Sequence, residues 1–81
     1  MNAPVSFPIP SAAEQCRAHI AELAGVIGAS AEIIERYAEL GDDTGLEYQI
    51  RRLILHVRAA AATFKDLAKI ENARRAESEA A

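Results

Sequence analysis

The stretch ELGDDTGLE, residues 39–47, decides the fold. Gly41 can take the left-handed backbone conformation that ends a helix, and Thr44-x-x-Glu47 has the spacing of an N-terminal capping box. Residues 11–81, on both sides of this stretch, contain no proline. The pattern therefore predicts a helix that ends at residue 40, a turn over residues 41–45 and a second helix that begins at residue 46.

The first helix has an explicit start, because Ser11-x-x-Glu14 is a second capping box. Positions spaced alternately three and four residues apart then form one row, in which only a serine is polar. These positions are Ala13, Cys16, Ile20, Leu23, Ile27, Ser30, Ile34 and Tyr37. Two glycines in the middle leave a bend or break near Gly28 as an alternative. The unbroken row favours one helix over residues 11–40.

The second helix is predicted over residues 46–72, with a row of the same spacing. Its members are Leu46, Ile50, Leu53, Val57, Ala60, Phe64 and Leu67. Two helices of similar length on either side of a short turn pair in antiparallel fashion, so we expect an all-α helical hairpin over residues 11–75. Ser30 and His56 fall near the same level, which predicts a hydrogen bond between the helices.

Both ends of the chain differ from the hairpin. Residues 1–10 contain three prolines and predict an extended arm. Val5, Phe7 and Ile9 alternate along it and can share one face that lies across the helices. Residues 76–81 are polar and alanine-rich and predict a frayed tail.

The hairpin over residues 11–75 has more apolar positions than one pair of helices can bury. Isolated hairpins of this size are marginally stable, and association into a homodimeric four-helix bundle is the simplest remedy. A higher oligomer remains an alternative. The expected oligomer interface comprises Ile20, Leu23, Val26, Ile27, Ile33, Ile34, Ile50, Leu53, Ile54, Val57 and Phe64.

The sequence contains no arrangement typical of catalysis or of cofactor binding. Cys16 is the one cysteine, which excludes a disulfide within the chain, and His19 near it makes only two potential metal ligands. Phosphate-binding and dinucleotide-binding glycine motifs are absent. We expect a protein that is not an enzyme and has no cofactor or metal, although a ligand site between protomers stays open. Without a leader pattern or a long apolar run, we expect a cytoplasmic protein with no membrane partner.

Charge is separated between the helices. Residues 11–40 carry five acidic and two basic side chains, a charge of −3, whereas residues 46–75 carry seven basic and three acidic ones, a charge of +4. Three of the basic residues recur at intervals of seven and lie beside a tyrosine and a leucine, which is typical of a binding surface. The expected partner-binding residues are Tyr48, Arg51, Arg52, Leu55, Arg58 and Lys65.

In outline the chain resembles the Rop family of plasmid copy-number regulators. The resemblance covers residues 11–70 and rests on length, the two capping boxes and the apolar rows. It implies a small acidic hairpin that dimerises into a four-helix bundle and binds RNA. The resemblance is architectural and assigns no site residue.

These observations predict a non-enzymatic helical module that binds an unidentified protein, as an inhibitor or adaptor of the kind found among phage and plasmid accessory proteins. The alternative is Rop-like binding of RNA or of a phosphate ligand by the basic residues of the second helix, which we rank lower because the net charge is −3. A third reading is an assembly subunit in which Tyr48 and Leu55 are covered by a further copy of the chain.

Overall fold

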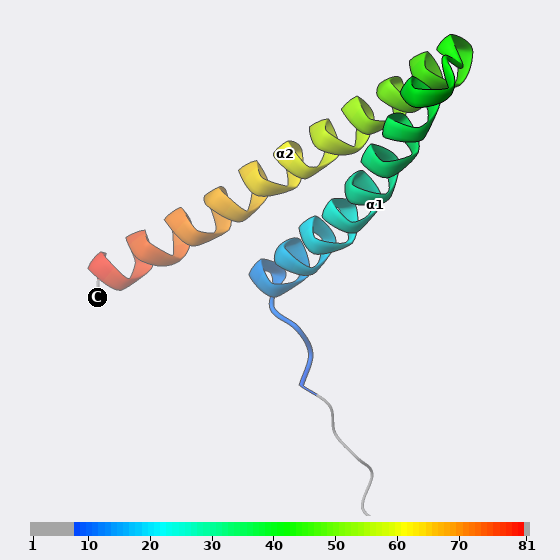
Figure 1. The fold of residues 1–81 in the computed structure, drawn as a ribbon. Helices are drawn as coiled ribbons and strands as arrows, with labels where there is room; N and C mark the ends of the chain where they lie inside the picture. Colours follow the sequence, from blue (N-terminus) through cyan, green and yellow to red (C-terminus); the bar gives the residue numbers. More distant parts are fainter. Residues whose placement is uncertain (1–7, 81) are drawn as a thin grey trace, which may run out of the picture.

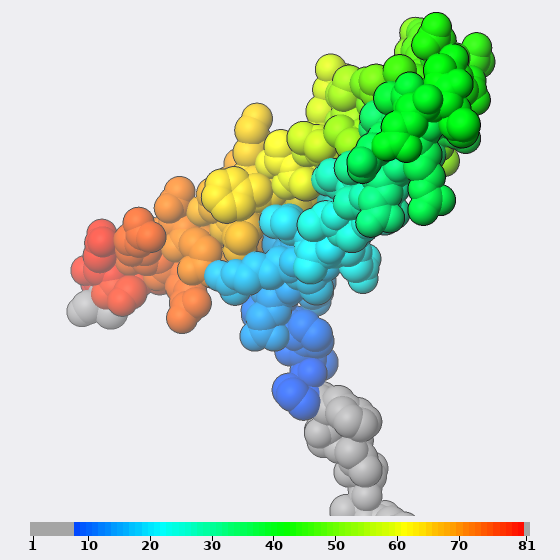
Figure 2. Space-filling model, viewed as in Figure 1, coloured from blue at the N-terminus to red at the C-terminus, as the bar shows by residue number. Residues whose placement is uncertain are grey.

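The computed structural model describes residues 8–80, which form two helices, α1 (Ala12–Leu40) and α2 (Asp43–Ala80). They run antiparallel on either side of a tight turn, and α2 continues past the start of α1 (Figure 1). The two helices are in contact along the length of α1 (Figure 2). The predicted all-α helical hairpin is confirmed.

α1 begins and continues as the sequence predicts. Ser11 is the N-cap, and its Oγ accepts a hydrogen bond of 3.1 Å from the backbone N–H of Glu14. The helix runs through Gly28 without interruption, so the alternative of a break there is wrong. Before it, Ile9 is 90% exposed and does not pack on the hairpin. Val5 and Phe7 lie outside the described residues.

The turn ends α1 with a complete Schellman motif. Gly41 has the predicted left-handed conformation, with φ 71°, and its N–H donates to the carbonyl of Ala38 at 3.2 Å. The N–H of Asp42 donates to the carbonyl of Tyr37 at 3.0 Å. Two carbonyls at the end of α1 therefore find partners within the turn itself.

α2 begins three residues earlier than predicted. Asp42 is its cap, because Asp42 Oδ1 accepts a 3.0 Å hydrogen bond from Gly45 N–H and its carbonyl accepts one of 2.9 Å from Leu46 N–H. The predicted turn over residues 41–45 and the predicted cap at Thr44 are therefore wrong. Aspartate is among the best N-cap residues, and here it follows directly after Gly41, so no longer loop is needed.

Gly45 lies in the first turn of α2, where a side chain would have no room. A Cβ atom there would lie 2.9 Å from Asp42 Oδ2 and 3.1 Å from Tyr37 Cε1. We expect Gly45→Ala to destabilise the hairpin by about 1 kcal/mol, because it displaces the capping carboxylate. Gly25→Ala, where nothing lies within 4 Å of the added atom, should stabilise it by up to about 1 kcal/mol. Thermal unfolding followed by circular dichroism tests the pair, and an equal rise in Tm for both would contradict the close contact.

The other end of α2 also differs from the prediction. The helix does not end at residue 72 but continues to Ala80, so residues 76–80 are helical in the structure. Residues 73–80 are rich in alanine, glutamate and arginine and lack glycine and proline, which favours helix without a packing partner. Residues 72–80 are all exposed.

The predicted row of α1 is confirmed at every position. All eight of its side chains are buried or half-buried, while their immediate neighbours in the sequence are exposed. The buried apolar residues of the hairpin are few. They are Ala13, Leu23 and Leu67. Ser30, 6% exposed, is buried with them.

The predicted row of α2 is half right. Leu46, Leu53, Ala60 and Leu67 are buried or half-buried and face α1, as predicted. The alternate positions do not: Ile50, Val57 and Phe64 are 40%, 44% and 61% exposed. We call these three the apolar row. Their places against α1 are taken by half-buried polar side chains, which we call the polar row. It comprises Gln49, His56 and Thr63.

Turn geometry explains this rotation of α2. The two-residue link brings Gly45 against the ring of Tyr37, which fixes the side of α2 that faces α1 from its first turn. Two members of the polar row are satisfied within their own helix: His56 Nδ1 donates to the Arg52 carbonyl at 2.8 Å, and Thr63 Oγ1 to the Ala59 carbonyl at 2.9 Å. The predicted hydrogen bond between Ser30 and His56 is not among those of the described residues.

Candidate interaction surfaces

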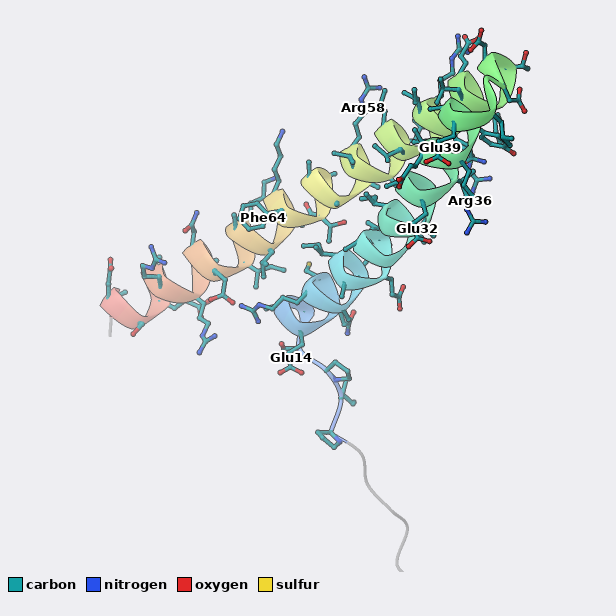
Figure 3. The ribbon with its side chains drawn as sticks, viewed as in Figure 1. Glu14, Glu32, Arg36, Glu39, Arg58 and Phe64 are labelled. Carbon is teal, nitrogen blue, oxygen red and sulfur yellow. The ribbon has the colours of Figure 1, made fainter. Side chains whose placement is uncertain are left out.

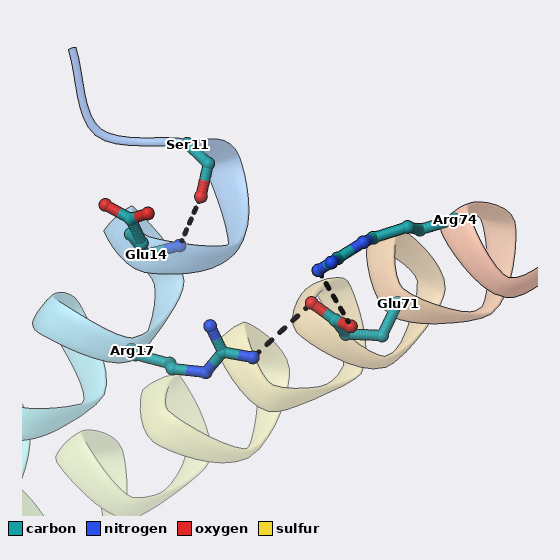
Figure 4. Close-up of polar contacts among 5 residues, drawn as sticks. All are labelled: Ser11, Glu14, Arg17, Glu71 and Arg74. Carbon is teal, nitrogen blue, oxygen red and sulfur yellow. Dashed lines mark hydrogen bonds and ion pairs between the residues drawn. The ribbon is translucent and has the colours of Figure 1, made fainter. Parts of the chain in front are cut away.

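An ion pair shows which rows of the two helices share a face. Arg17 Nη2 lies 3.4 Å from Glu71 Oε1, and Arg74 also reaches Glu71, at 3.8 Å (Figure 4). Glu71 is seven residues after Phe64, in line with the apolar row, and Arg17 is seven before Ala24. The apolar row of α2 and the row of small residues that includes Ala24 therefore border the same side of the hairpin.

We call this side the Val57 face. It combines large side chains on α2 with small ones on α1, and Phe64 is labelled on it in Figure 3. From α2 it contains Ile50, Ile54, Val57, Ala61, Phe64 and Ala68. From α1 it contains Ala21, Ala24, Gly28, Ala31 and Ala38. The α2 set repeats the three-and-four spacing of a helix contact, so α2 has a second contact stripe that its own hairpin does not cover.

The opposite side carries another apolar row, which we call the Val26 face. Val26, Ile33 and Leu40 project from α1 there and are 40%, 38% and 79% exposed. The neighbouring row of α2 contains Arg52 and Ala59. Tyr48 and Leu55 lie between this face and the outer edge of α2.

The predicted oligomer-interface residues fall into three groups. Inside the hairpin lie Ile20, Leu23, Ile27, Ile34 and Leu53. On the Val26 face lie Val26 and Ile33. On the Val57 face lie Ile50, Ile54, Val57 and Phe64. The structure therefore does not bring the eleven residues together, and a single interface between two hairpins cannot use all of them.

The outer edges of the hairpin carry opposite charges. Arg51, Arg58 and Lys65, which we call the basic row, lie on the side of α2 turned away from α1. On the outer side of α1 an open hollow is lined by acidic residues and one arginine, a grouping that sequence reasoning missed although the acids have helical spacing. It comprises Glu32, Glu35, Arg36 and Glu39. Glu32 and Arg58 project from opposite edges (Figure 3).

All six predicted partner-binding residues are exposed. Tyr48 and Leu55 are the large apolar side chains among them, 57% and 62% exposed. Arg52 Nη1 donates to Tyr48 Oη at 3.4 Å, and its guanidinium lies 5.8 Å from the centre of the Tyr48 ring. Arg51 pairs with Glu47 at 2.7 Å. Arginines thus surround an apolar patch on one side of α2.

An open hollow marks the middle of this surface. It is lined by Arg51, Ile54, Leu55 and Arg58, so apolar side chains form its floor between two guanidinium groups. A second hollow follows toward the turn and includes Glu47 and Tyr48. An elongated surface of this kind suits a helix or an extended segment of another molecule.

The described residues form neither a metal-binding cluster nor a membrane-spanning helix. Across residues 8–80, no three His, Cys, Asp or Glu side chains come close enough to hold a metal ion. Neither helix, over the part of the chain that the structure describes, has an apolar stretch that could cross a membrane. Cys16, the free thiol, is half-buried between the helices.

Comparisons of the chain with protein-family models, with curated protein sequences and with solved structures gave no significant match. The function is therefore inferred from the surfaces of the hairpin.

Proposed function

We propose that the protein is a non-enzymatic binding module that acts as a homodimeric four-helix bundle. The small core supports the assembly, because two buried leucines and one alanine leave little apolar burial to offset the loss of conformational entropy. Large apolar side chains are meanwhile exposed on both sides of the hairpin. Association of two copies buries one of these sides.

The binding surface of this module is the Tyr48–Leu55 side of α2, and its partner is another protein. The observation that carries this proposal is the exposure of Tyr48 and Leu55 at 57% and 62% between arginines. Aromatic and arginine side chains are enriched where proteins recognise one another. The fitting partner is an acidic protein segment with apolar anchors, which the module occupies as an inhibitor or adaptor.

Within residues 8–80, Arg51 is the one member of the basic row that forms an ion pair. The acidic edge of α1 lies on the other side of the hairpin from the basic row, so Glu32 cannot neutralise Arg58 of the same chain (Figure 3). Glu47 pairs with Arg51 only. Electrostatic attraction therefore favours an acidic molecule at this edge and speeds its association.

Leu55→Asp tests the protein-binding surface. We expect at least a tenfold loss of partner capture, because the change places a carboxylate in the centre of the apolar patch. Leu55 is replaced by a photo-crosslinking residue to identify the captured partner from a nuclease-treated lysate, with Glu32 labelled in the same way as a control on the opposite edge. The purified partner is then titrated against the native protein and the variant.

Ile9→Asp provides the matched substitution at an exposed apolar residue outside the hairpin. It should leave capture unchanged, and both variants should keep their helicity and molar mass. Equal affinity of the Leu55→Asp variant and the native protein for the cross-linked partner would contradict the proposed surface.

A second candidate function is binding of RNA or another phosphate ligand by the basic row. The alignment of Arg51, Arg58 and Lys65 along one exposed edge favours it. Reversal of these three charges would then lower the slope of log affinity against log salt by about 3. This candidate replaces the first if the only molecule retained by the native protein is removed by nuclease.

A further inference from the structure

We infer that the Val57 face is the surface that a second copy covers, and that the two-fold axis of the dimer runs parallel to the helices. In this arrangement α2 of one chain packs on α1 of the other, and both turns lie at the same end of the bundle. The inference rests on the self-association proposed above and assigns its face and symmetry.

Size complementarity supports this arrangement. Gly45 lies against Tyr37, and the helices rise equally per residue in opposite directions. Twelve residues farther along α2, Val57 is therefore level with Gly25 of α1. We call the small residues of α1 on the Val57 face the small row, and Val57 lies between its members Ala24 and Gly28. An axis parallel to the helices keeps this level, so Val57 meets the small row of the partner, and the partner's Val57 meets the same row of the first chain.

Gly28 is the member of this row that the hairpin alone does not explain. Glycine in the interior of a helix costs about 1 kcal/mol relative to alanine. Nothing within the hairpin requires it, because a Cβ at Gly28 would meet no atom within 4 Å. Its position on the Val57 face, level with the apolar row, is where a helix of a second copy would approach most closely. Gly25 has equally open surroundings but lies on the outer edge of α1, and it supplies a control.

Charge complementarity selects the direction of the axis. With the axis parallel to the helices, the acidic edge of α1 lies beside the basic row of the partner's α2. Counted from the contact of Gly45 with Tyr37, Arg51 is level with Ala31 and close to Glu32 of the acidic edge. A perpendicular axis would instead stack acidic edge on acidic edge and large side chains on large ones. Like charges placed together disfavour that alternative.

The arrangement has a consequence for binding. The Val26 face stays on the outside of the bundle together with Tyr48 and Leu55, whereas Ile54, which also lines the hollow between Arg51 and Arg58, lies toward the second copy. A dimer therefore presents two equivalent copies of the proposed partner surface, one on each side. Tyr48 and Leu55, which lie outside the Val57 face, are therefore the residues at which partner binding is tested separately from self-association.

Substitution of the two glycines tests the face. Gly28→Leu should raise the dimer dissociation constant at least 100-fold, because the added side chain fills the space of the partner's apolar row. Gly25→Leu should change it less than twofold. Both variants should keep their helicity, since both gain helix propensity and neither added Cβ meets an atom within the hairpin. Equal dimerisation of the two variants, measured by analytical ultracentrifugation, would overturn the assigned face.

A distance between spin labels tests the symmetry. Residue 44 is exposed and marks the turn of each chain. The substitutions Thr44→Cys and Cys16→Ala allow one spin label to be attached there. The inference predicts a separation of about 20–30 Å, because neighbouring helices pack about 10 Å apart and each label adds its own length. Turns at opposite ends would separate the labels by more than about 40 Å, the length of the 29-residue α1.

The outcomes distinguish the inferred symmetry of the dimer from the proposed self-association. A dimer with the long label distance would overturn the inferred symmetry and leave the proposed self-association intact. A native chain that stays monomeric would overturn both. Partner capture by the Leu55 surface is measured separately and is affected by neither result.

Discussion

Leu67→Ala is expected to destabilise the hairpin by about 2–4 kcal/mol, enough to leave a large fraction of the chain unfolded at room temperature. Leu67 is 9% exposed and is one of only three buried apolar residues in the described chain. Its removal leaves a space between the helices, and two helices have few other side chains that can move to fill it. Thermal unfolding followed by circular dichroism should show a Tm lowered by about 10–25 °C.

Leu55→Ala is the matched control, since it makes the same change in the same helix at a residue that is 62% exposed. The free energy of unfolding should change by no more than about 0.5 kcal/mol. A comparable loss of stability in the two variants would show that Leu67 is not part of the core.

Val57→Asp is expected to convert the dimer to monomers. Val57 lies in the middle of the Val57 face, and a carboxylate there would be buried against the partner's Ala24 and Gly28 without a counter-charge. The hairpin itself should stay folded as a monomer, because Val57 is 44% exposed in the single chain. Sedimentation equilibrium should give an increase of at least 100-fold in the dimer dissociation constant.

Val26→Asp is the control for this prediction. Val26 is 40% exposed, almost the same as Val57, but lies on the opposite side of the hairpin. The substitution should leave the dimer dissociation constant within about threefold of the native value, a free-energy change below about 0.7 kcal/mol. Dissociation caused by Val26→Asp and not by Val57→Asp would transfer the interface to the Val26 face.

The sequence predicts the extent of α1 because the unbroken apolar row favours one helix over a break near Gly28. The row from Ala13 to Tyr37 keeps its spacing without a break, and Gly28 does not disturb it since helical backbone is accessible to glycine. The end at Gly41 is equally clear. The start of α2 is less clear, because Asp42 and Thr44 are both good N-cap residues and only the geometry of the turn decides between them.

α2 is predicted only in part. Leu46, Leu53, Ala60 and Leu67 can form a contact stripe either with the apolar row or with the polar row. Hydrophobicity favours the stripe that contains Val57. In the structure the stripe that contains His56 faces α1, because the contact of Gly45 with Tyr37 sets the rotation of α2. A sequence pattern shows that a helix has an apolar stripe but does not show whether its own hairpin or a second chain covers it.

The same limit applies to the interaction surfaces. The exposure of the basic row follows from its spacing, and the structure agrees for Arg51, Arg58 and Lys65. The placement of the acidic edge on the opposite side depends on how both helices are rotated, and that rotation is set by the turn. The division of the apolar residues between the Val57 and Val26 faces has the same origin.

The molar mass of the native chain in solution, measured by light scattering over a series of concentrations, tests most directly whether the hairpin associates with a second copy. We predict a mass of twice the 8.7 kDa of the single chain, which falls toward 8.7 kDa as dilution dissociates the dimer. A mass of 8.7 kDa at every concentration would contradict it.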